Sequence, residues 1–425
     1  MLTDSSSTGA VAAPRGGSAR GGLRVPAPLL IVLGLTIVGA VFRVVDLTSQ
    51  SYWFDEAQAA HELHLSFGGM LSAWSAGEPN PPLYFLVAWP WAQIFGTGEG
   101  GLRALSAVLG IGLIPLVYLS GKELISRRAG LFAAALAAVN PFLIWYSQEA
   151  REYMLLCVLA TASVLLFARA WREPTGRRLA WWALVAALAL LTQYFAGFLI
   201  GAEAALLLWR ARSRSTLLAL AALLVVEAAL GIDYYEARAL IPGWAPLALV
   251  IGAACAAAGT RVAGGSLAVI LVAAFIYAGI VIRDSPQYEK ANWRAVAATL
   301  PVPHQTRAVA AFDGSFAAAP LALYLPGVRW TGTGQIPQTS LTPVRVSELD
   351  LVASVYDSLA PRLPAGVRLI SHRVVDGYQV DRFALRPTWM MSRTSIAARA
   401  GTLFGPGLPI PVVLIQRAPH VGAVS

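Results

Sequence analysis

Long runs of apolar residues, almost free of charge, constrain this chain more than any other feature. Runs of about 17–25 such residues can cross a bilayer as helices, and runs of this kind recur from residue 27 to residue 282. Hydrophobic residues make up 57% of the chain and charged residues only 13%, too apolar for a soluble domain. We therefore expect a polytopic α-helical membrane protein with about nine spans. The expected spans are 27–45, 102–120, 129–146, 153–170, 179–193, 195–209, 216–232, 240–259 and 265–282.

The run 82–96 is also apolar, but it is short and contains Pro82 and Pro90. Clusters of Lys and Arg mark the cytoplasmic side of a membrane protein. These clusters fall at alternate connections only if the run 82–96 does not cross. We therefore expect an interfacial helix there, within a first outer loop at 46–101 that contains no Lys or Arg. The Ser-, Gly- and Arg-rich segment 1–25 is then expected to be a disordered cytoplasmic tail.

The chain changes character after the membrane region, which is expected to occupy residues 26–282. Polar content rises, and short strand-like runs alternate with helix-like stretches and turn signals. The runs are 307–312, 349–356, 366–374 and 377–385, and the stretches are 314–324 and 357–362. We expect a small extracytoplasmic α/β domain at 283–395, followed by a loose tail at 396–425.

Charge and motifs exclude several functions. The formal charge of +9 comes from short clusters between apolar runs and not from a basic surface suited to nucleic acid. Cys157 and Cys255 lie inside apolar runs, so they are expected to be core residues and not a disulfide. The sequence contains no P-loop, no dinucleotide fingerprint and no Gly-x-Ser-x-Gly motif, so nucleotide and serine hydrolysis have no support.

Two adjacent carboxylates, Asp55 and Glu56, follow three aromatic residues just after the first expected span. Asp55 with Gln58 three residues later matches a capping box, so Asp55 could simply begin an interfacial helix. A carboxylate against aromatic rings at the edge of hydrocarbon is also partly desolvated, which strengthens it as a base. Both interpretations stay open.

A second polar cluster is YSQEAREY, from Tyr146 to Tyr153, in a turn between two expected spans. A helix start at Glu149 and an arginine reaching the headgroups would explain part of it. Four single arginines also lie on the outer side, where they give no benefit to topology: Arg43, Arg103, Arg151 and Arg238. We favour an ion pair with a loop acid for Arg103. For Arg151 and Arg238 a lipid-borne phosphate is an equal alternative, because a guanidinium binds phosphate at two points.

His61 and His64 lie three residues apart in the helix expected after Asp55, with Glu62 between them. They could hold a divalent metal together with a carboxylate. No third ligand stands at a diagnostic spacing, so a simple interfacial helix face is the alternative. No other cofactor is indicated.

Several motifs, in order over about residues 27–300, resemble the GT-C superfamily of integral-membrane glycosyltransferases. The bacterial protein O-mannosyltransferase and aminoarabinose-transferase branch is the most similar. The motifs are YWFDEA at 52–57, NPPLYF at 80–85, LRALSAVLG at 102–110, YSQEAREY at 146–153, EARALIPGWAPLALV at 236–250 and YEKANWRAVAATL at 288–300.

This resemblance implies a function and a site. Such enzymes move a sugar from a polyprenyl-phosphate donor to a lipid, glycan or protein acceptor. It implies an inverting hexosyl- or pentosyltransferase in a bacterial-type plasma membrane, with a cytoplasmic N-terminus and membrane lipids around it. Asp55 would be the general base, with Glu56 beside it. The donor and its phosphate would be bound by Arg43, Tyr146, Gln148, Glu149, Arg151, Tyr153 and Arg238, and the acceptor or its loop by Asn80, Tyr84, Gln193 and Tyr194.

The chain departs from the family pattern at several positions. Gln193 stands where relatives carry a His, Ala239 where they carry a Tyr, and Asn292 where an Asp precedes Trp-Arg. The middle of the chain, at about 210–236, is also short, which bears on acceptor binding. The alternatives are a transporter of lipid-linked sugar or a catalytically inactive scaffold. Transport favours polar groups at mid-membrane and two related halves, whereas the polar groups here gather on one side.

Overall fold

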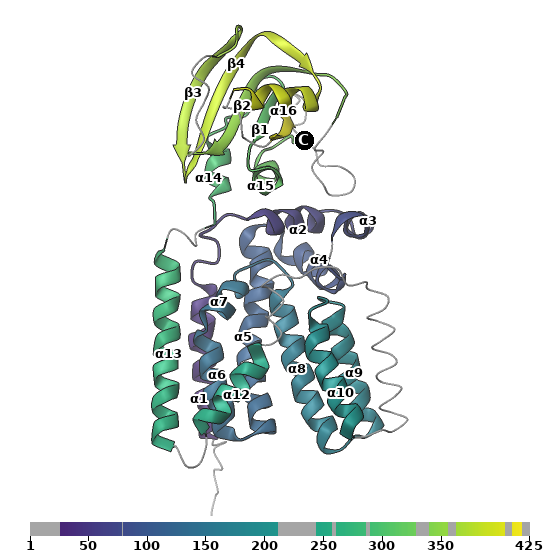
Figure 1. Ribbon diagram of the computed structural model, residues 1–425, viewed down its shortest axis with the longest axis vertical. Helices are drawn as coiled ribbons and strands as arrows, with labels where there is room; N and C mark the ends of the chain where they lie inside the picture. The colour runs from purple at the N-terminus through teal and green to yellow at the C-terminus, as the bar shows by residue number, and fades with distance from the viewer. Residues whose placement is uncertain are drawn as a thin grey trace, which may run out of the picture.

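Among the described residues, helices precede Ser285, and a five-stranded sheet with three further helices follows (Figure 1). The structure is a computed structural model, and it describes residues 26–78, 80–210, 244–256, 261–285, 290–328, 340–355, 363–403 and 410–418. The helices are α1 (Ala27–Val44), α2 (Phe54–His64), α3 (Phe67–Gly77), α4 (Leu83–Phe95), α5 (Glu99–Leu124), α6 (Arg127–Val139), α7 (Pro141–Ser147), α8 (Tyr153–Arg172), α9 (Gly176–Leu190), α10 (Ala196–Arg210), α12 (Trp244–Ala256), α13 (Arg261–Asp284), α14 (Trp293–Ala298), α15 (Ser315–Tyr324) and α16 (Arg393–Gly401). The strands are β1 (Arg307–Ala311), β2 (Val344–Ser354), β3 (Val367–Val375), β4 (Tyr378–Met391) and β5 (Val412–Gln416).

Among the described residues, four helices are long and apolar enough to span a membrane: α1, α5, α8 and α13. Helices α6 and α7 meet at a bend of 57° and would count as a fifth span if taken together. Only 17% of the 18-residue apolar stretch of α1 is buried, and only 6% of that of α13. The apolar side chains of these two helices therefore face outward, as lipid-facing helices require. Helices α9 and α10, of 15 residues each, occupy the expected spans 179–193 and 195–209. The expected span 216–232 lies outside the described residues.

The bend between α6 and α7 has an identifiable cause. Asn140 caps α7, its side chain accepting from the Leu143 N–H at 2.9 Å, and Pro141 occupies the first position. Pro141 has no N–H to give to the Ala137 carbonyl four residues earlier. The buried Arg43 replaces it, donating to the Ala137 oxygen at 2.9 Å and to the Ala138 oxygen at 3.0 Å. A broken helix is thus satisfied inside apolar surroundings, as a membrane demands.

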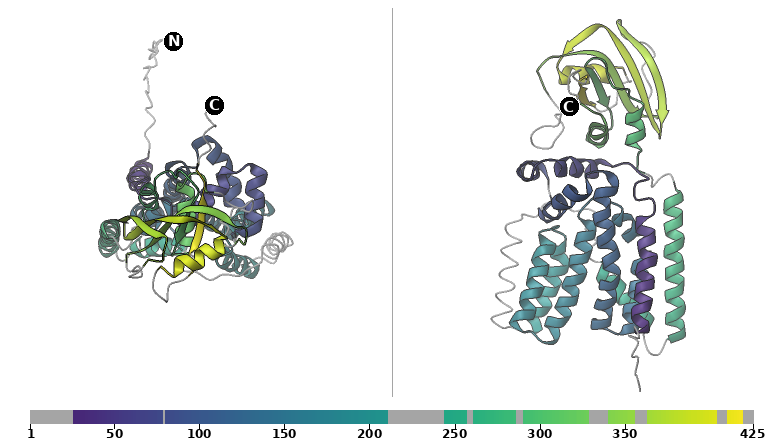
Figure 2. Two further views of the ribbon diagram at one scale, coloured as in Figure 1. Left: turned by 90° about the horizontal axis from the view of Figure 1, so that it is seen from above. Right: turned by 180° about the vertical axis from the view of Figure 1, so that it is seen from behind.

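Helices α2, α3 and α4 lie between the bundle and the sheet (Figures 1 and 2). Helix α4 is the short apolar run that the sequence placed at an interface. Its Tyr84 and Phe85 are buried with Ala57 of α2 and Leu105 of α5 in one core cluster. The layer therefore connects the apolar bundle below it to the sheet above it.

The sheet has the order β3-β4-β2-β1-β5, with β1 and β2 parallel and the other neighbours antiparallel. Helices α14 and α15 pack against one face and α16 against the other. All four predicted strand runs form strands and the stretch 314–324 forms α15, whereas 357–362 lies outside the described residues. The prediction of a loose tail at 396–425 was wrong for the segment that forms β5. This strand is buried throughout and pairs with β1, because its alternate residues fill both core clusters of the sheet.

The sheet domain is bound to the first loop by polar contacts. Glu99 at the start of α5 accepts from Arg294 at 2.7 Å and from the Tyr324 hydroxyl at 2.5 Å. The Ser51 hydroxyl bonds to the Ala291 carbonyl at 2.8 Å and accepts from the Trp293 N–H at 2.9 Å. These contacts place the segment that precedes α14 directly beside α2.

Candidate active site

Helix α2 directs its two neighbouring carboxylates to different surroundings. The helix begins at Phe54, with Trp53 as its N-cap residue, and Glu56 accepts from the Trp53 N–H at 3.5 Å. The prediction that Asp55 and Gln58 form the capping box was therefore wrong. Glu56 is the acid three residues after the N-cap, and Gln58 instead donates to Glu62 at 3.2 Å.

Glu56 is fully buried and pairs with Arg103 of α5. Nε and NH2 of Arg103 donate to its two oxygens at 2.8 and 2.7 Å, a two-point pair of the strong kind. The same guanidinium donates to the carbonyls of Leu47, Gln50 and Ser51 and so fixes the turn before α2. The ion pair expected for Arg103 is present, with Glu56 as its acid.

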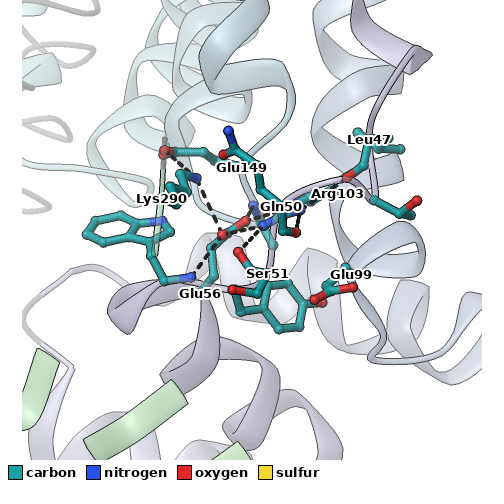
Figure 3. Close-up of polar contacts among 12 residues, drawn as sticks. Leu47, Gln50, Ser51, Glu56, Glu99, Arg103, Glu149 and Lys290 are labelled. Carbon is teal, nitrogen blue, oxygen red and sulfur yellow. Dashed lines mark hydrogen bonds and ion pairs between the residues drawn. The ribbon is translucent and has the colours of Figure 1, made fainter. Parts of the chain in front are cut away.

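Lys290 completes this network from the segment before α14 (Figure 3). Its Nζ lies 2.9 Å from Glu149 and 3.4 Å from Glu56, and its side chain is 11% exposed. It also lies within 5.6 Å of the centres of the Trp53 and Trp145 rings, a distance at which the faces of aromatic rings attract cations. Lys290 therefore joins the loop after α7, α2 and the sheet domain at one point.

The two carboxylates around Lys290 differ in pKa. Burial raises the pKa of Glu56, but Lys290, Arg103 and the Ala150 N–H outweigh burial and hold it below its usual value. Burial and the charge of Glu56 raise the pKa of Glu149, and Lys290 offsets this only in part. Glu56 is therefore a fixed anion, and its Coulomb field makes the second carboxylate costly to ionise.

A second network surrounds Arg151, in the turn between α7 and α8. Its NH2 donates to Glu78 at 3.0 Å, and its Nε lies 3.0 Å from Glu152. Asn80 donates to the same Glu78 oxygen at 2.9 Å. Burial lowers the pKa of Arg151, but the charges of Glu152, Glu78 and Asp55 outweigh it and hold the pKa well above its usual value. Arg151 is thus a permanent cation among carboxylates.

Several buried polar atoms near this network have no hydrogen-bond partner among the described residues. They are Oε2 of Glu62, the Tyr84 hydroxyl, Oε1 of Glu152 and Oε1 of Gln193. Nε of Arg151 and Oε2 of Glu152 meet each other as an ion pair at 3.0 Å. Burial and the charge of Glu78 raise the pKa of Glu62 to about 7, and burial with the charges of Glu78 and Asp55 raises that of Glu152 to about 7. Unpartnered buried polar groups cost free energy. A polar ligand that hydrogen-bonds to them would recover it.

Asp55 lies on the Arg151 side of α2. It is half-buried, and its charge contributes to the pKa values of both Arg151 and Glu152. The half-buried Tyr194 is on this side too, because the charge of Glu78 acts on its hydroxyl. Gln193 precedes Tyr194 in a turn. In this turn the Leu191 carbonyl accepts a hydrogen bond from the N–H of Leu83, the first residue of α4, at 3.0 Å. The fold therefore brings Asp55 to the same region as Gln193 and Tyr194, which the sequence predicted as site residues.

Other residues that were predicted to bind the sugar donor make contacts within the helical bundle. Arg43 is fully buried and also donates to Gly39 and Ser147, so all three of its nitrogens are used within the bundle. The Gln148 amide donates to the Val45 carbonyl at 2.9 Å and caps the end of α1. Tyr146 and Tyr153 pack edge to face, with ring centres 4.7 Å apart. Arg238 lies outside the described residues.

The histidine pair has no metal-binding geometry in the described part of the chain. His64 is exposed, while burial and the charge of His64 lower the pKa of His61 to about 4. No group of three His, Cys, Asp or Glu side chains there could hold a metal ion.

Four site residues received no role from the sequence: Glu62, Glu78, Glu152 and Lys290. Lys290 is a single cation on the expected outer side after the last span, the same signal that selected the outer arginines. Extending that rule to lysine would have found it. Glu78 precedes NPPLYF in a loop of several acids, and only the fold distinguishes it from the others.

The sequence of residues 79–232 matches the family model described as dolichyl-phosphate-mannose-protein mannosyltransferase. This segment contains the turn with Arg151 and the Gln193 turn. This match covers about a third of the chain and agrees with the resemblance to GT-C glycosyltransferases. A search of the curated proteins found no match.

Solved structures similar to this chain include three transferases. The oligosaccharyltransferase AglB from Archaeoglobus fulgidus, in complex with an inhibitory peptide and a dolichol-phosphate, is 18% identical at a TM-score of 0.38, over 59% of this chain and 37% of its own. The S. cerevisiae protein O-mannosyltransferase Pmt1-Pmt2 complex, bound to the sugar donor, is 15% identical at 0.37, over 83% and 42%. ArnT from Cupriavidus metallidurans, bound to undecaprenyl phosphate, is 14% identical at 0.36, over 64% and 63%. This chain thus spans less than two-thirds of each, and these TM-scores add no support beyond the family match.

Proposed function

We propose that this protein is a membrane glycosyltransferase that moves a sugar from a polyprenyl-phosphate donor to an acceptor hydroxyl. The site lies on the side of the bundle that carries the sheet domain, which we propose is the extracytoplasmic side of a bacterial-type plasma membrane. The acceptor is a lipid, a glycan or a protein. The match of residues 79–232 to the dolichyl-phosphate-mannose-protein mannosyltransferase family model supports the reaction class.

One observation carries the proposal: buried polar atoms without partners gather near Arg151, beside the half-buried Asp55. A sugar presents several hydroxyl groups, and a phosphate presents acceptor oxygens. Phosphate oxygens can accept hydrogen bonds from Tyr84 and Arg151, and a sugar hydroxyl can donate one to Oε1 of Glu152. A purely structural cluster would be expected to have its buried polar groups paired.

The proposed reaction is a single displacement. The Asp55 carboxylate takes the proton of the acceptor hydroxyl as the hydroxyl oxygen attacks the anomeric carbon. The bond between that carbon and the phosphate oxygen breaks, and the polyprenyl phosphate leaves with the electron pair. Because attack and departure occur on opposite faces, the anomeric configuration is inverted. Arg151, held by Glu78 and Glu152, is the cation that binds the leaving phosphate and stabilises its charge.

A divalent metal is the one cofactor that the sequence indicates. Among the described residues, the candidates His61 and His64 do not converge with a third ligand. Asp55 is placed instead beside a guanidinium, which can hold a phosphate without a metal.

Mass spectrometry of lipids and envelope glycans tests the function in cells. Cells that produce the native protein should contain a glycosylated product that is missing when Asp55→Asn is produced at the same level. The control is Glu173→Gln, which removes an acid that is 68% exposed and pairs with Arg178. Glu173 follows α8 directly, and α8 meets α9 at the end of the bundle far from the sheet (Figure 1). A product present in equal amount in all three strains would overturn the proposal.

A further inference from the structure

One face of the sheet carries a row of arginines where α14 and α15 do not cover it. Successive residues of a strand point to opposite faces of a sheet. Val346, Phe383 and Leu385 are buried in the core cluster on the α16 side, so the residues next to them point the other way. The cross-strand pairs extend this face over β2, β3 and β4. Its arginines, which we call the arginine stripe, are Arg345, Arg368, Arg373, Arg382 and Arg386.

Most of the arginine stripe has no ion pair. Arg382 pairs with Glu348 at 2.6 Å, and the buried Arg307, on the same face of β1, lies 3.1 Å from Asp350. These pairs use the two acids that β2 contributes, and Nη2 of Arg307 still has no hydrogen-bond partner in the described part of the chain. The other four residues of the stripe are exposed and have no ion pair with a described residue: Arg345, Arg368, Arg373 and Arg386.

Other acids near this face do not cancel its charge. Asp376, in the turn between β3 and β4, accepts from the Asn292 N–H at 2.5 Å, and Asp313 is hydrogen-bonded to Tyr378. Both acids lie at the end of the face that is nearest Arg373, so they leave the rest of the stripe unbalanced. The segments 329–339 and 356–362, outside the described residues, contain two arginines and one aspartate. The face therefore keeps a net positive charge.

The arginine stripe follows β4 over most of its length. It runs from Arg373, opposite Val380, to Arg345, opposite Met390, with Arg368 between them. A strand rises about 3.4 Å per residue, so the row is roughly 30 Å long. A guanidinium binds a carboxylate or a phosphate at two points. A row of this length fits a chain of anions and not one small ion.

The surface between the arginines favours a glycan as that chain. Ser371, Ala384 and Thr388 lie there, with Met390 at one end. The described part of this face has no exposed aromatic ring, on which the bases of a nucleic acid would stack. Protein interfaces are instead centred on large aromatic or apolar anchors. We propose that the arginine stripe binds a linear anionic glycan of the cell envelope through its carboxylate or phosphate groups. The inference rests on the proposed function only in placing the sheet domain on the extracytoplasmic side.

Fluorescence anisotropy of a labelled galacturonic acid polymer, titrated with the full-length protein in detergent, tests the inference. We expect binding that weakens as the salt concentration rises. The double variant Arg368→Gln, Arg373→Gln should bind about fivefold less tightly, as two exposed ion pairs contribute. Both side chains are exposed, so this variant should keep the native melting temperature. The control Arg393→Gln, Arg399→Gln removes the same charge from α16, on the opposite face, and should bind as the native protein does.

Asp55→Asn should also bind the polymer normally, which separates a failure of this site from a failure of the proposed reaction. Equal losses in the two double variants would mean that net charge alone attracts the polymer, and they would refute the site. Absence of binding, or equal binding of the fully methyl-esterified polymer, would refute it too. Tighter binding of poly-L-glutamate or of single-stranded DNA would assign the stripe to another class of partner and overturn the proposal.

Discussion

Asp55 and Glu56 are adjacent in the sequence, yet α2 turns their carboxylates toward different partners. Glu56 meets two cations and a backbone N–H, which lower its pKa and fix it as an anion. Asp55 faces the Arg151 network, where the described residues leave polar atoms unpaired. The acidic pair was visible in the sequence, but the division between a positioning residue and a proposed base was not. It depends on Arg103 and Lys290, which are 47 and 234 positions away from Glu56.

The raised pKa values of Glu62 and Glu152 predict a pH-dependent stability. Both rise from 4.5 to about 7 in the folded protein, so folding favours their protonated forms. This contribution is fully present below about pH 4.5 and is lost as the pH rises to about 7. We expect the melting temperature of ligand-free protein in detergent to fall across this interval. The double variant Glu62→Gln, Glu152→Gln should flatten that fall, and an unchanged slope would contradict the assignment.

Substitution of Arg151 is predicted to impair the use of the donor and not that of the acceptor. Arg151→Lys keeps the charge beside Glu78 and Glu152 but loses the planar fork that binds phosphate at two points. We expect the donor KM to rise and kcat/KM for the donor to fall about tenfold or more, corresponding to one charge-assisted hydrogen bond. The acceptor KM should change little. Steady-state kinetics with each substrate varied in turn would measure this, and unchanged donor constants would remove Arg151 from the phosphate site.

The helices were predictable where apolar runs are long, and their breaks were not. The sequence placed one expected span at 129–146, but Asn140 and Pro141 divide it into α6 and α7. That division carries the polar turn after α7 into the site. Strand β5 was missed for a related reason: its short apolar run follows Gly and Pro residues, and only pairing with β1 makes it a strand. In both cases tertiary contacts decide the local structure.

Arg43 is predicted to hold the break between α6 and α7 together. Arg43→Gln removes the donors to the Ala137 and Ala138 carbonyls, which are buried among apolar side chains. Each unsatisfied carbonyl costs about 1–3 kcal/mol. Thermal unfolding in detergent should show a clear loss of stability, whereas Arg128→Gln, at the exposed start of α6, should not. Equal melting temperatures of Arg43→Gln and the native protein would mean that Arg43 does not stabilise the break.

The whole molecule has three layers: the bundle, then α2, α3 and α4, and then the sheet domain (Figure 1). Glu99 binds the sheet domain to the start of α5, and Lys290 binds it to α2 and the loop after α7. The division into a membrane region and an α/β domain followed from hydropathy alone. The contacts between these two regions could not be predicted from hydropathy, because they join residues more than 140 positions apart.

The topology predicts where each end of α5 lies. Reporter fusions within residues 97–100 should report the extracytoplasmic side, and a fusion at Leu124 the cytoplasmic side, because α5 is a spanning helix between them. This result requires that α4 does not cross the membrane. A cytoplasmic signal at 97–100 would make α4 a span and reverse the proposed side of the site.

The central proposal is that Asp55 is the base for sugar transfer, and a comparison of binding with turnover tests it most directly. Purified Asp55→Asn should bind a polyprenyl-phosphate sugar about as tightly as the native protein does, because Arg151 and its neighbours are unchanged. Its transfer rate at saturating donor and acceptor should fall about 10²–10⁴-fold, the contribution of a general base. A rate within twofold of the native value would contradict the assignment and leave Asp55 as a residue of the first turn of α2.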